Sequence, residues 1–357
     1  MKTIIRVIQK DTMEAVTAEA AEIWKRGGLV AFPTETVYGL GGNGLDPEAS
    51  KKIYAAKGRP SDNPLILHIA DRKQAEGLAS DISEAGRLLM ERFWPGPLTL
   101  IFPKAKNIPL ETTGGLETVA IRMPSHPVAQ ALLRKAGLPI AAPSANLSGR
   151  PSPTLARDVK EDMDGRIDMI VDGGEVGIGV ESTIVDVTGE VPTILRPGYI
   201  TEEMLRDVVG RVAVDPAVAG SVGAEVKPKA PGMKYRHYAP KAPMVLVEGS
   251  CDAVAEALNR VLEKAERDGK KIGILASEEN ARQYRGGVVK VVGSHKNLDC
   301  VAHNLYRVLR EFDREEVEMT YSECFGGQAF GQAVMNRLKK AAGQHVIRAE
   351  EAAENEM

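Results

Sequence analysis

Cationic and short polar side chains gather in several loops within the first 200 residues. Lysine and arginine occur in KGRPSDNP (57–64), TVAIRMP (118–124) and LRPG (195–198). Serine, threonine and asparagine occur in APSANLSGRPSPT (142–154) and GVEST (179–183). Phosphate groups are bound by fixed cations together with several short hydrogen-bond donors. The pattern therefore predicts a site for a polyanionic, phosphorylated ligand.

Each of these side chains also has a purely structural interpretation. Lys57 can complement a helix dipole, Arg122 can pair with a surface acid, and serines beside prolines can form turns. His68, within an apolar strand, is more typical of a satisfied core histidine than of a ligand contact. Their shared position next to strand ends, where open α/β sheets bind ligands, favours the site. The candidates are Lys57, Arg59, Arg122, Arg150 and Arg196 with Ser144, Asn146, Ser148, Ser152, Ser182 and Thr183.

The stretch PTETVYGLGG (33–42) follows the apolar run GGLVAF, and it is either a turn or the wall of a pocket. Gly39, Gly41 and Gly44 match the dinucleotide-binding pattern G-x-G-x-x-G. About 20 residues further on, however, the expected ribose-binding acid is replaced by a cationic loop. Neither a Walker GxxxxGK[ST] sequence nor a GxSxG elbow occurs. Ordinary NAD, P-loop and serine-hydrolase sites are thereby disfavoured.

The elements that must position these residues alternate between short β-like runs and helical patterns from residue 28 to about 197. The runs include LVAF, LILHI, LTLIF, TVAIRM, LPIAA, MIVDGG, STIVDV and TILRPG. Some neighbours are too close for a crossover helix, which predicts a mixed sheet. A helix after Asp46 has a capping aspartate, Pro47 at its first position and Gly58 at its end.

The remainder of the chain divides into a linker and a second domain. Residues 213–242 are rich in Ala, Gly, Pro and Val and lack periodicity, which predicts an interdomain linker after a domain of residues 1–212. From 243 to 357, strand and helix patterns alternate again. This alternation predicts a smaller, Rossmann-like α/β domain with a parallel sheet.

The composition excludes several classes of protein. The 357 residues carry a net charge of −3, which disfavours a strongly basic nucleic-acid binder. No membrane span or signal peptide is evident, so we expect a cytoplasmic protein without a membrane partner. Three widely spaced cysteines (Cys251, Cys300 and Cys324) are interpreted as buried thiols, and six scattered histidines indicate no protein metal site.

At this point the motifs resemble a known family. FPTETVYGLGGNGLDPEASKKIYAAKGRPSDNPLILHI (32–69), RFWPGPLTLIF, GLETVAIRMP, PIAAPSANLSGRPSPT, DGGEVGIGVESTIVDVTG and ILRPG resemble the YrdC-like catalytic domain of threonylcarbamoyl-AMP synthases. PGMKYRHYAPKAP (231–243) and the domain after it resemble the long, two-domain form. ECFGGQAFGQAVMNRLKKAAG (323–343) contains the family's Asn-Arg-Leu helix, although the run before that helix departs from the family pattern.

The resemblance implies a nucleotidyltransferase that makes L-threonylcarbamoyladenylate and pyrophosphate from ATP, L-threonine and bicarbonate, with Mg²⁺ accompanying ATP. It implies a catalytic tetrad of Lys57, Arg59, Ser144 and Asn146. The nucleotide-binding positions that it implies are Arg59, Asn63, Thr118, Ser144, Ser152, Arg196 and Arg236. The threonine-binding positions that it implies are Thr36, His68, Arg122, Ala142 and Ser182. On this interpretation PTET faces substrate, and the glycines that follow let the backbone crowd the pocket.

The product would pass to the threonylcarbamoyl-transferase machinery that modifies the adenosine beside the anticodon of tRNA. The linker, with Arg236 reaching the nucleotide, is a candidate lid over the active site.

Two alternatives to this function stay open. One is an RNA-binding module of the YrdC-like fold without turnover, and weak RNA binding is also compatible with the enzyme. The other is a carbamoyl-transfer protein of hydrogenase maturation, although this chain lacks the acylphosphatase and zinc-finger segments of that class.

Overall fold

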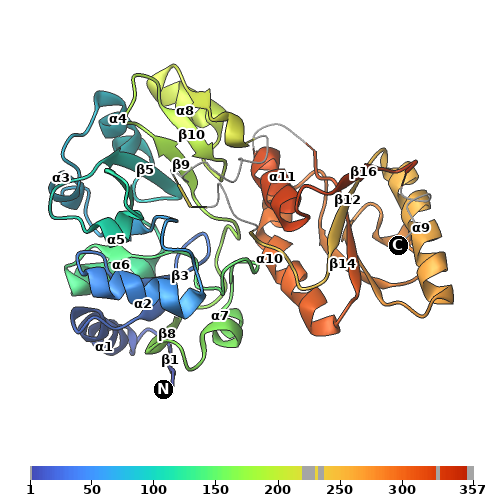
Figure 1. The fold of residues 1–357 in the computed structure, drawn as a ribbon, viewed down its shortest axis with the longest axis horizontal. Coiled ribbons are helices and arrows are strands. Elements are labelled where there is room, and N and C mark those ends of the chain that lie inside the picture. Colours follow the sequence, from blue (N-terminus) through green and yellow to red (C-terminus); the bar gives the residue numbers. More distant parts are fainter. Residues whose placement is uncertain (1, 219–229, 232–236, 327–329, 352–357) are drawn as a thin grey trace. The chain divides into compact units, whose positions relative to one another are not determined.

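The structure, a computed structural model, describes residues 2–218, 230–231, 237–326 and 330–351 (Figure 1). The chain divides into two compact units. The first comprises Met1–Ser148 and Ser152–Tyr235, and the second comprises Gly149–Pro151 and Arg236–Met357. The three residues Gly149–Pro151 therefore group with the second unit, although the chain on both sides of them belongs to the first.

The first unit is built on a mixed sheet, as the sequence predicted. Within the described residues its strand order is β1-β8-β2-β3-β7-β4-β6-β5-β9-β10-β11. Parallel pairs such as β4 with β6 alternate with antiparallel pairs such as β5 with β6. The strands are β1 (Ile4–Val7), β2 (Val30–Pro33), β3 (Tyr38–Asn43), β4 (Ile66–His68), β5 (Leu98–Pro103), β6 (Thr118–Arg122), β7 (Ile140–Ala141), β8 (Met169–Asp172), β9 (Thr183–Asp186), β10 (Thr193–Arg196) and β11 (Ala213–Val214).

Helices cover both faces of this sheet. Side chains of β2 alternate between two hydrophobic clusters, because successive residues of a strand point to opposite faces. Phe32 packs with the α1 and α6 side chains Trp24 and Leu132, whereas Ala31 belongs to a larger cluster that includes Ile53 of α2. The helices are α1 (Met13–Lys25), α2 (Pro47–Lys57), α3 (Gln74–Leu78), α4 (Glu84–Phe93), α5 (Leu110–Thr113), α6 (Pro127–Ala136), α7 (Ala156–Met163) and α8 (Glu202–Val209).

Helix α2 confirms the capping signals read from the sequence. The Asp46 carboxylate accepts a hydrogen bond from the Glu48 backbone N–H at 2.9 Å, and Pro47 occupies the first turn. Gly58 ends the helix at φ 61°, a left-handed conformation that favours glycine. These signals define the end of the helix, so that Lys57 is its last residue.

Strand β3 refines the interpretation of the segment PTETVYGLGG. Residues 34–37 form the turn between the antiparallel strands β2 and β3, in which the Thr34 N–H donates to the Val37 oxygen at 3.2 Å, whereas the glycine-rich part forms a strand. Tyr38–Asn43 pairs antiparallel with β2. A Cβ on Gly41 would lie 2.8–2.9 Å from atoms of Ile140, Phe32 and Trp24. These neighbours are core side chains, so Gly41 lets large apolar groups pack close to the strand. Tertiary packing thus overrides the low strand propensity of glycine.

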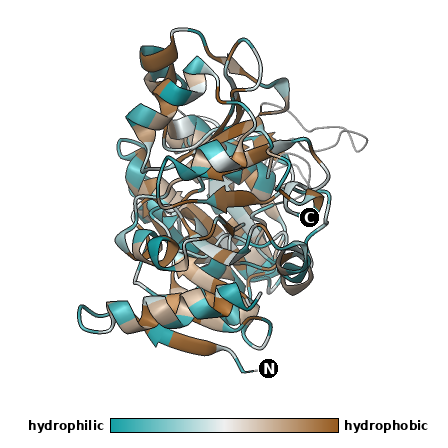
Figure 2. Ribbon diagram, turned by 90° about the vertical axis from the view of Figure 1, so that its left-hand side faces the viewer, coloured by the Kyte–Doolittle hydropathy of each residue, from teal (hydrophilic) through white to brown (hydrophobic). Residues whose placement is uncertain are grey.

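At one edge of the sheet, β1 pairs in parallel with β8 near the N-terminus, where Figure 2 shows it in the brown of apolar residues. Ile4, Ile5 and Val7 are 38%, 39% and 56% exposed. This strand was not predicted from the sequence. Its side chains lack the alternation of a half-buried strand, because each residue of the strand is exposed.

The second unit has a parallel sheet, as predicted, with strand order β14-β13-β15-β12-β16. Its strands are β12 (Met244–Glu248), β13 (Ile272–Ser277), β14 (Val288–Gly293), β15 (Met319–Glu323) and β16 (Val346–Arg348). Its helices are α9 (Cys251–Arg267), α10 (Leu298–Glu315) and α11 (Phe330–Ala341). Helix α11 contains the Asn-Arg-Leu sequence, of which Arg337 is fully buried.

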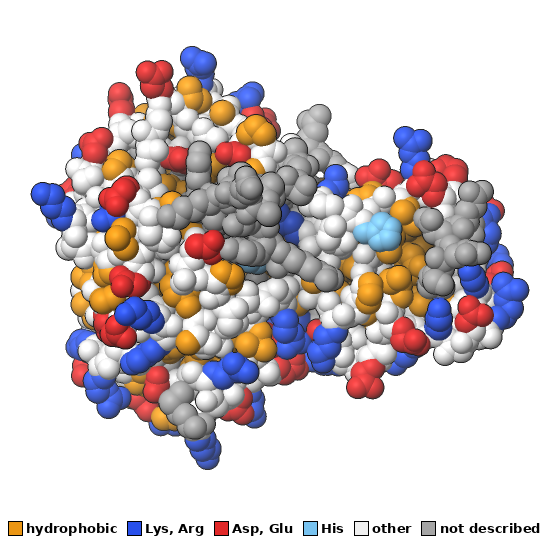
Figure 3. Space-filling view, in the orientation of Figure 1, with side chains coloured by type: hydrophobic (Ala, Val, Ile, Leu, Met, Phe, Trp, Pro, Cys, Tyr) orange, Lys and Arg blue, Asp and Glu red, His pale blue; other side chains and the backbone are white. Residues whose placement is uncertain are grey.

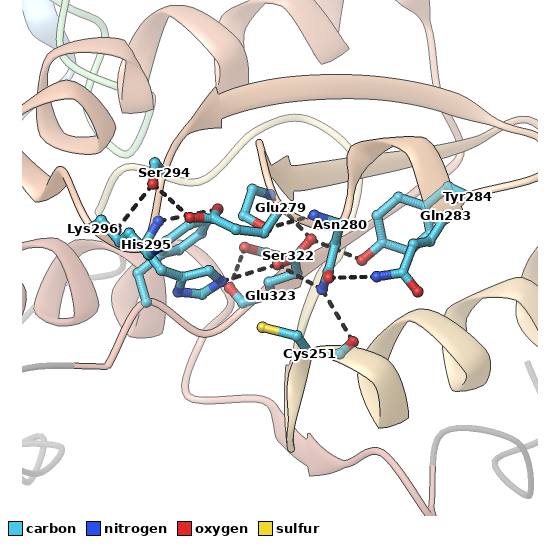
Figure 4. A network of polar contacts seen from close by, with 12 residues as sticks. Cys251, Glu279, Asn280, Gln283, Tyr284, Ser294, His295, Lys296, Ser322 and Glu323 are labelled. Atoms are coloured by element: carbon cyan, nitrogen blue, oxygen red, sulfur yellow. Dashed lines mark hydrogen bonds and ion pairs between the residues drawn. The ribbon is translucent and has the colours of Figure 1, made fainter.

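The carboxyl ends of β13, β14 and β15 are joined by a polar network around Glu323 (Figure 4). Glu323 is 2% exposed, and it accepts hydrogen bonds from the Ser277 N–H at 3.0 Å and the Tyr284 hydroxyl at 2.8 Å. Its other oxygen lies 3.2 Å from Asn280 Nδ2 and 3.3 Å from His295 Nε2. These four partners satisfy the buried carboxylate and hold the loops after β13 and β14 against β15.

The interpretation of the cysteines as buried thiols is wrong for Cys251, which is exposed at the start of α9. Cys300 and Cys324 are partly buried. Burial raises the pKa of the Cys324 thiol from 9.0 to about 12, so that thiol stays protonated at neutral pH.

Candidate active site

Lys57 joins two sequence motifs that lie far apart in the chain. Its ammonium donates to the backbone oxygen of Asn146 at 2.6 Å and also to the backbone oxygen of Ser144. The backbone oxygen of Lys57 in turn accepts from the Ser148 N–H at 2.9 Å. Lys57 is only 2% exposed. The end of helix α2 therefore holds the segment that contains Ser144 and Asn146.

The same segment is also held by strand β3. Gly39 and Ser144 form an antiparallel β-bridge, and the Ala145 N–H donates to the Tyr38 oxygen at 2.8 Å. The Ser144 hydroxyl donates to Asn146 Oδ1 at 2.5 Å. The structure thus brings together Lys57, Ser144 and Asn146, three members of the expected tetrad.

Arg59 and Asn63 lie on the loop after α2. The Arg59 guanidinium donates to the backbone oxygens of Asn63 at 3.2 Å and Pro64 at 3.0 Å, and it is 9% exposed. Asn63 is 2% exposed, and its side-chain oxygen Oδ1 has no hydrogen-bond partner among the described residues. A buried amide oxygen without a donor is costly, so a donor from water or from a bound molecule would stabilise it.

Arg122, at the end of β6, contacts the PTET segment. Its Nη1 donates to the Thr36 hydroxyl at 2.9 Å, and its Nη2 lies 2.8 Å from a Glu35 carboxylate oxygen. The Arg122 and Glu35 side chains are 5% and 13% exposed. Thr36 also shares a hydrogen bond with Thr34 at 2.9 Å. The polar PTET segment therefore encloses a buried cation.

Arg196, at the end of β10, donates hydrogen bonds to both the backbone and the side chain of Ser182. Its Nε donates to the Ser182 backbone oxygen at 3.1 Å, and its Nη2 donates to the Ser182 hydroxyl at 3.2 Å. Thr99 of β5 shares a 2.7 Å hydrogen bond with the same hydroxyl. Arg196 also donates to the Pro231 oxygen at 3.4 Å. Ser182 and Arg196 are 1% and 5% exposed, so their geometry is fixed by the interior of the unit.

Ser152 and Thr118 are the remaining positions of the first unit at which the sequence predicts nucleotide binding. The Ser152 hydroxyl donates to Glu181 Oε1 at 2.5 Å, and both residues are buried. Thr118 begins β6 and is partly exposed. Ser152 is thereby joined to the GVEST loop, next to Ser182.

His68 ends β4 with 3% of its surface exposed. Its Nδ1 lies 3.1 Å from the Ile66 oxygen, and its ring meets the Phe32 ring edge-on at 6.2 Å. Burial, together with the nearby positive charge of Arg122, lowers the pKa of His68 from 6.5 to about 3. Ala142, also buried, donates its N–H to the Ile66 oxygen at 2.9 Å. His68 is therefore a neutral side chain beside Arg122.

Three polar partners of the site were not predicted from the sequence: the buried Thr99 and Glu181, and the partly buried Glu35. Glu35 pairs with Arg122, Thr99 with Ser182 and Glu181 with Ser152. Glu35 and Glu181 belong to the motifs PTET and GVEST, so their position in the sequence could have identified them as candidates for the site. Thr99 lies in the apolar strand β5, and only its hydrogen bond to the Ser182 hydroxyl in the structure identifies it as a partner of the site.

Arg236 lies outside the described residues, together with Lys234 and Tyr235 of the KYRHYAP segment. The described end of that segment belongs to the second unit: Tyr238 is 5% exposed and its ring centroid lies 5.3 Å from that of Tyr306. Before the undescribed residues 232–236, Ala230 of the linker is fully buried in a small cluster of the first unit with Ile66 and Leu195. The chain on each side of these residues is thus packed on one unit.

The described residues contain no group of three or more His, Cys, Asp and Glu side chains that could hold a metal ion. None of their helices combines the length and apolar character that a membrane crossing requires. On the face drawn in Figure 3, basic and acidic side chains are interspersed.

The fold and site together define a class: an α/β protein that gathers buried cations, hydroxyls and amides at the strand ends of its first unit. Comparison with known proteins is consistent with this. Residues 22–198 match the Sua5/YciO/YrdC family model, described as telomere recombination. Residues 200–343 match the model described as the C-terminal domain of threonylcarbamoyl-AMP synthase.

Full-length relatives and a solved structure extend the match. A Bacillus subtilis protein named threonylcarbamoyl-AMP synthase is 51% identical over 94% of this chain and 96% of its own length. A protein of the same name from Pyrococcus abyssi is 48% identical over 97% and 99%. The crystal structure of Pyrococcus abyssi Sua5 complexed with L-threonine is similar at 46% identity and a TM-score of 0.91, covering 98% of this chain and 99% of that chain. The chain belongs to the Sua5/YciO/YrdC family, in its two-domain form.

Proposed function

We propose that this chain is a threonylcarbamoyl-AMP synthase that uses L-threonine, bicarbonate and ATP and releases pyrophosphate. One observation carries the proposal: Lys57, two positions before Arg59, donates to the backbone oxygens of Ser144 and Asn146 and so joins the two halves of the expected tetrad. Relatives that carry this enzyme name align over nearly the full chain. The reaction makes the enzyme a nucleotidyltransferase, because the adenylyl group of ATP is transferred to a carbamate oxygen and pyrophosphate leaves.

The surroundings of Arg122 suit threonine. A guanidinium can bind a carboxylate through two parallel hydrogen bonds, and Arg122 is buried at the end of β6. Thr36 and Ser182 supply short hydroxyls for the substrate's polar groups. We assign threonine binding to Thr36, His68, Arg122, Ala142 and Ser182. The Pyrococcus abyssi relative, crystallised as a complex with L-threonine, supports this choice of amino acid.

The nucleotide is assigned to the other cations and polar groups. Asn63 Oδ1, buried without a described partner, is an acceptor for a ligand N–H such as an amino group of adenine. Arg59 and Arg196 provide positive charge for phosphates. We assign nucleotide binding to Arg59, Asn63, Thr118, Ser144, Ser152, Arg196 and Arg236, and catalysis to Lys57, Arg59, Ser144 and Asn146.

The chemistry needs no protein nucleophile. The amine of threonine adds to carbon dioxide derived from bicarbonate and loses a proton, which gives a carbamate. A carbamate oxygen then attacks the α-phosphorus of ATP, and the bond to the β-phosphate oxygen breaks to release pyrophosphate. Negative charge concentrates around that phosphorus in the transition state, and fixed cations stabilise it.

Magnesium fits this site as a companion of ATP. Glu35 and Glu181, the acids in contact with the assigned residues, already pair with Arg122 and Ser152. We therefore assign Mg²⁺ chiefly to phosphate oxygens and water, which match its preference for oxygen ligands and retained water. When bound, the ion would neutralise charge on the pyrophosphate leaving group.

The proposed product is an activated acyl group, so a group-transfer step must consume it. We assign that step to the threonylcarbamoyl-transferase machinery acting on tRNA, and the cytoplasm, where ATP and tRNA occur together, is the corresponding compartment. Direct binding of RNA by this chain would be weak and incidental to its catalysis.

The test is a reaction with ATP, Mg²⁺, bicarbonate and labelled threonine, followed by separation of the adenylate and assay of pyrophosphate. We expect pyrophosphate release to require threonine and bicarbonate together, because the carbamate is the attacking group. Equal release with either one omitted would show that the assigned reaction is wrong. Salt-dependent RNA binding without any turnover would instead support the binding-module alternative.

A further inference from the structure

The tripeptide Gly149–Pro151 lies within the segment that carries Ser144, Asn146 and Ser152, yet it groups with the second unit. Gly149 has φ 90°, a left-handed conformation that favours glycine. Its backbone oxygen accepts from the Ala239 N–H at 2.9 Å. The chain therefore leaves the first unit for three residues in the middle of a motif assigned to the nucleotide.

Two side chains of helix α10 hold this tripeptide. Arg310, which is fully buried, donates to the Pro151 oxygen at 2.6 Å. The Asp313 carboxylate forms an ion pair with Arg150 at 3.1 Å, and the two side chains are 3% and 23% exposed. The second carboxylate oxygen of Asp313 accepts from the Lys241 N–H at 2.7 Å. Asp313 thus contacts both the tripeptide and the end of the linker.

The ion pair changes the role expected for Arg150. From the sequence, Arg150 was predicted to be one of the cations for a polyanion, but its charge is paired with Asp313. Because the Asp313 carboxylate is buried, removing Arg150 would leave its charge uncompensated, which is strongly destabilising. Asp313 is therefore suited to fix the position of Arg150 rather than to bind a ligand.

We propose that Asp313 is a positioning residue for the nucleotide site, acting through Arg150 and the 149–151 tripeptide. The segment is held by Lys57 on the side of Ser144 and by helix α10 on the side of Ser152. Pro151 directly precedes Ser152, and Gly149 follows Asn146 by three positions, so a shift of the tripeptide moves both assigned side chains. The inference rests on the proposed function, since it concerns the ATP site of that reaction.

The experiment compares Asp313→Asn, Arg150→Met and the double variant with the full-length wild-type chain. Asp313→Asn keeps the size and an acceptor for Lys241 but removes the charge. Glu311→Gln is the matched control on α10, because it weakens a pair with Arg307 at 2.7 Å that does not involve the tripeptide. For each protein, KM for ATP, KM for threonine and kcat are measured, along with Kd for ATP by calorimetry.

We expect the KM and Kd for ATP to rise about tenfold in each single variant, since small misplacements of binding groups are costly. The KM for threonine should stay within about twofold of wild type, because the residues assigned to threonine come from other segments. The double variant should lose little more than the worse single variant, because both changes remove the same contact. Arg150→Lys, which keeps the charge, should recover part of the loss.

The proposal is overturned if ATP affinity stays within about twofold of wild type in both single variants, or if their effects simply add in the double variant. Equal increases in both KM values would also overturn it. If Asp313→Asn does not fold, the Arg150→Met and Arg150→Lys pair decides the same question. If the wild type binds ATP but makes no threonylcarbamoyl-AMP, the proposed function fails while the Kd values still decide the positioning role. A wild type that does not bind ATP overturns both.

Discussion

The Nζ atom of Lys57 lies 2.6 Å from the backbone oxygen of Asn146, although the two residues are separated by 89 positions in the chain. The same ammonium bonds the Ser144 oxygen. A lysine at the C-terminal end of a helix commonly interacts with the helix's own last carbonyls. Lys57 instead donates to backbone oxygens of the loop that contains Ser144 and Asn146. It therefore fixes the conformation of that loop in addition to supplying positive charge.

Lys57→Met should lower both stability and turnover. The change removes the donor that the Ser144 and Asn146 carbonyls share, at a cost of roughly 1–3 kcal/mol in the free energy of unfolding. Turnover should fall on the order of 10²-fold, the scale for loss of a preorganised charge-stabilising group. Urea unfolding and pyrophosphate release measure the two effects. Lys51→Met, which removes an exposed ion pair with Glu48 on the same helix, is the control. A Lys57→Met protein as stable as wild type would contradict the loop-holding role.

Arg122→Lys should raise the KM for threonine by about tenfold or more, because lysine cannot form the paired hydrogen bonds that a guanidinium gives a carboxylate. The KM for ATP should be unchanged. Steady-state kinetics with each substrate varied in turn provide the measurement. Arg87→Lys, on the exposed surface of α4, controls for the substitution itself. An increase confined to the KM for ATP would move Arg122 from the threonine site to the nucleotide site.

His68→Gln should flatten the dependence of stability on pH in acid. The unfolded chain takes up a proton near pH 6.5, whereas the folded pKa of His68 is about 3. Between these values the unfolded state binds more protons, so the stabilising contribution is complete above pH 6.5 and is lost as the pH falls toward 3. The slope contributed by His68 approaches about 1.4 kcal/mol per pH unit. Unfolding free energies at pH 4, 5, 6 and 7 test it. An unchanged slope in the variant would show that His68 titrates normally in the fold.

Gly41→Ala should destabilise the first unit by roughly 1–3 kcal/mol, because the added Cβ would overlap Ile140, Phe32 and Trp24 in a packed core. Gly77→Ala is the matched control. A Cβ at Gly77 meets nothing within 4 Å, and alanine in helix α3 should be neutral or stabilise the protein by up to about 1 kcal/mol. Thermal and urea unfolding compare the two. Equal stabilities of the two variants would be incompatible with the close packing at Gly41.

Local chemistry explains what the sequence could predict. The Asp46, Pro47 and Gly58 signals define α2 because capping depends on residues within one turn of the helix end. The mixed sheet of the first unit and the parallel sheet of the second follow from apolar runs and from the lengths between them. The family resemblance rests on short motifs, and these motifs contain the residues that the site assignments use. Each of these inferences needs only neighbours along the chain.

Only the tertiary structure decided which atoms meet. The glycine-rich segment is a strand, and at Gly41 the side chains of Trp24, Phe32 and Ile140 occupy the space that a Cβ would need. Arg150 pairs with Asp313, 163 positions away. Likewise, Arg122 meets Thr36 across 86 positions. Hydrogen bonds and packing depend on distances in space, and no local pattern reports a partner that the fold brings in from a distant segment.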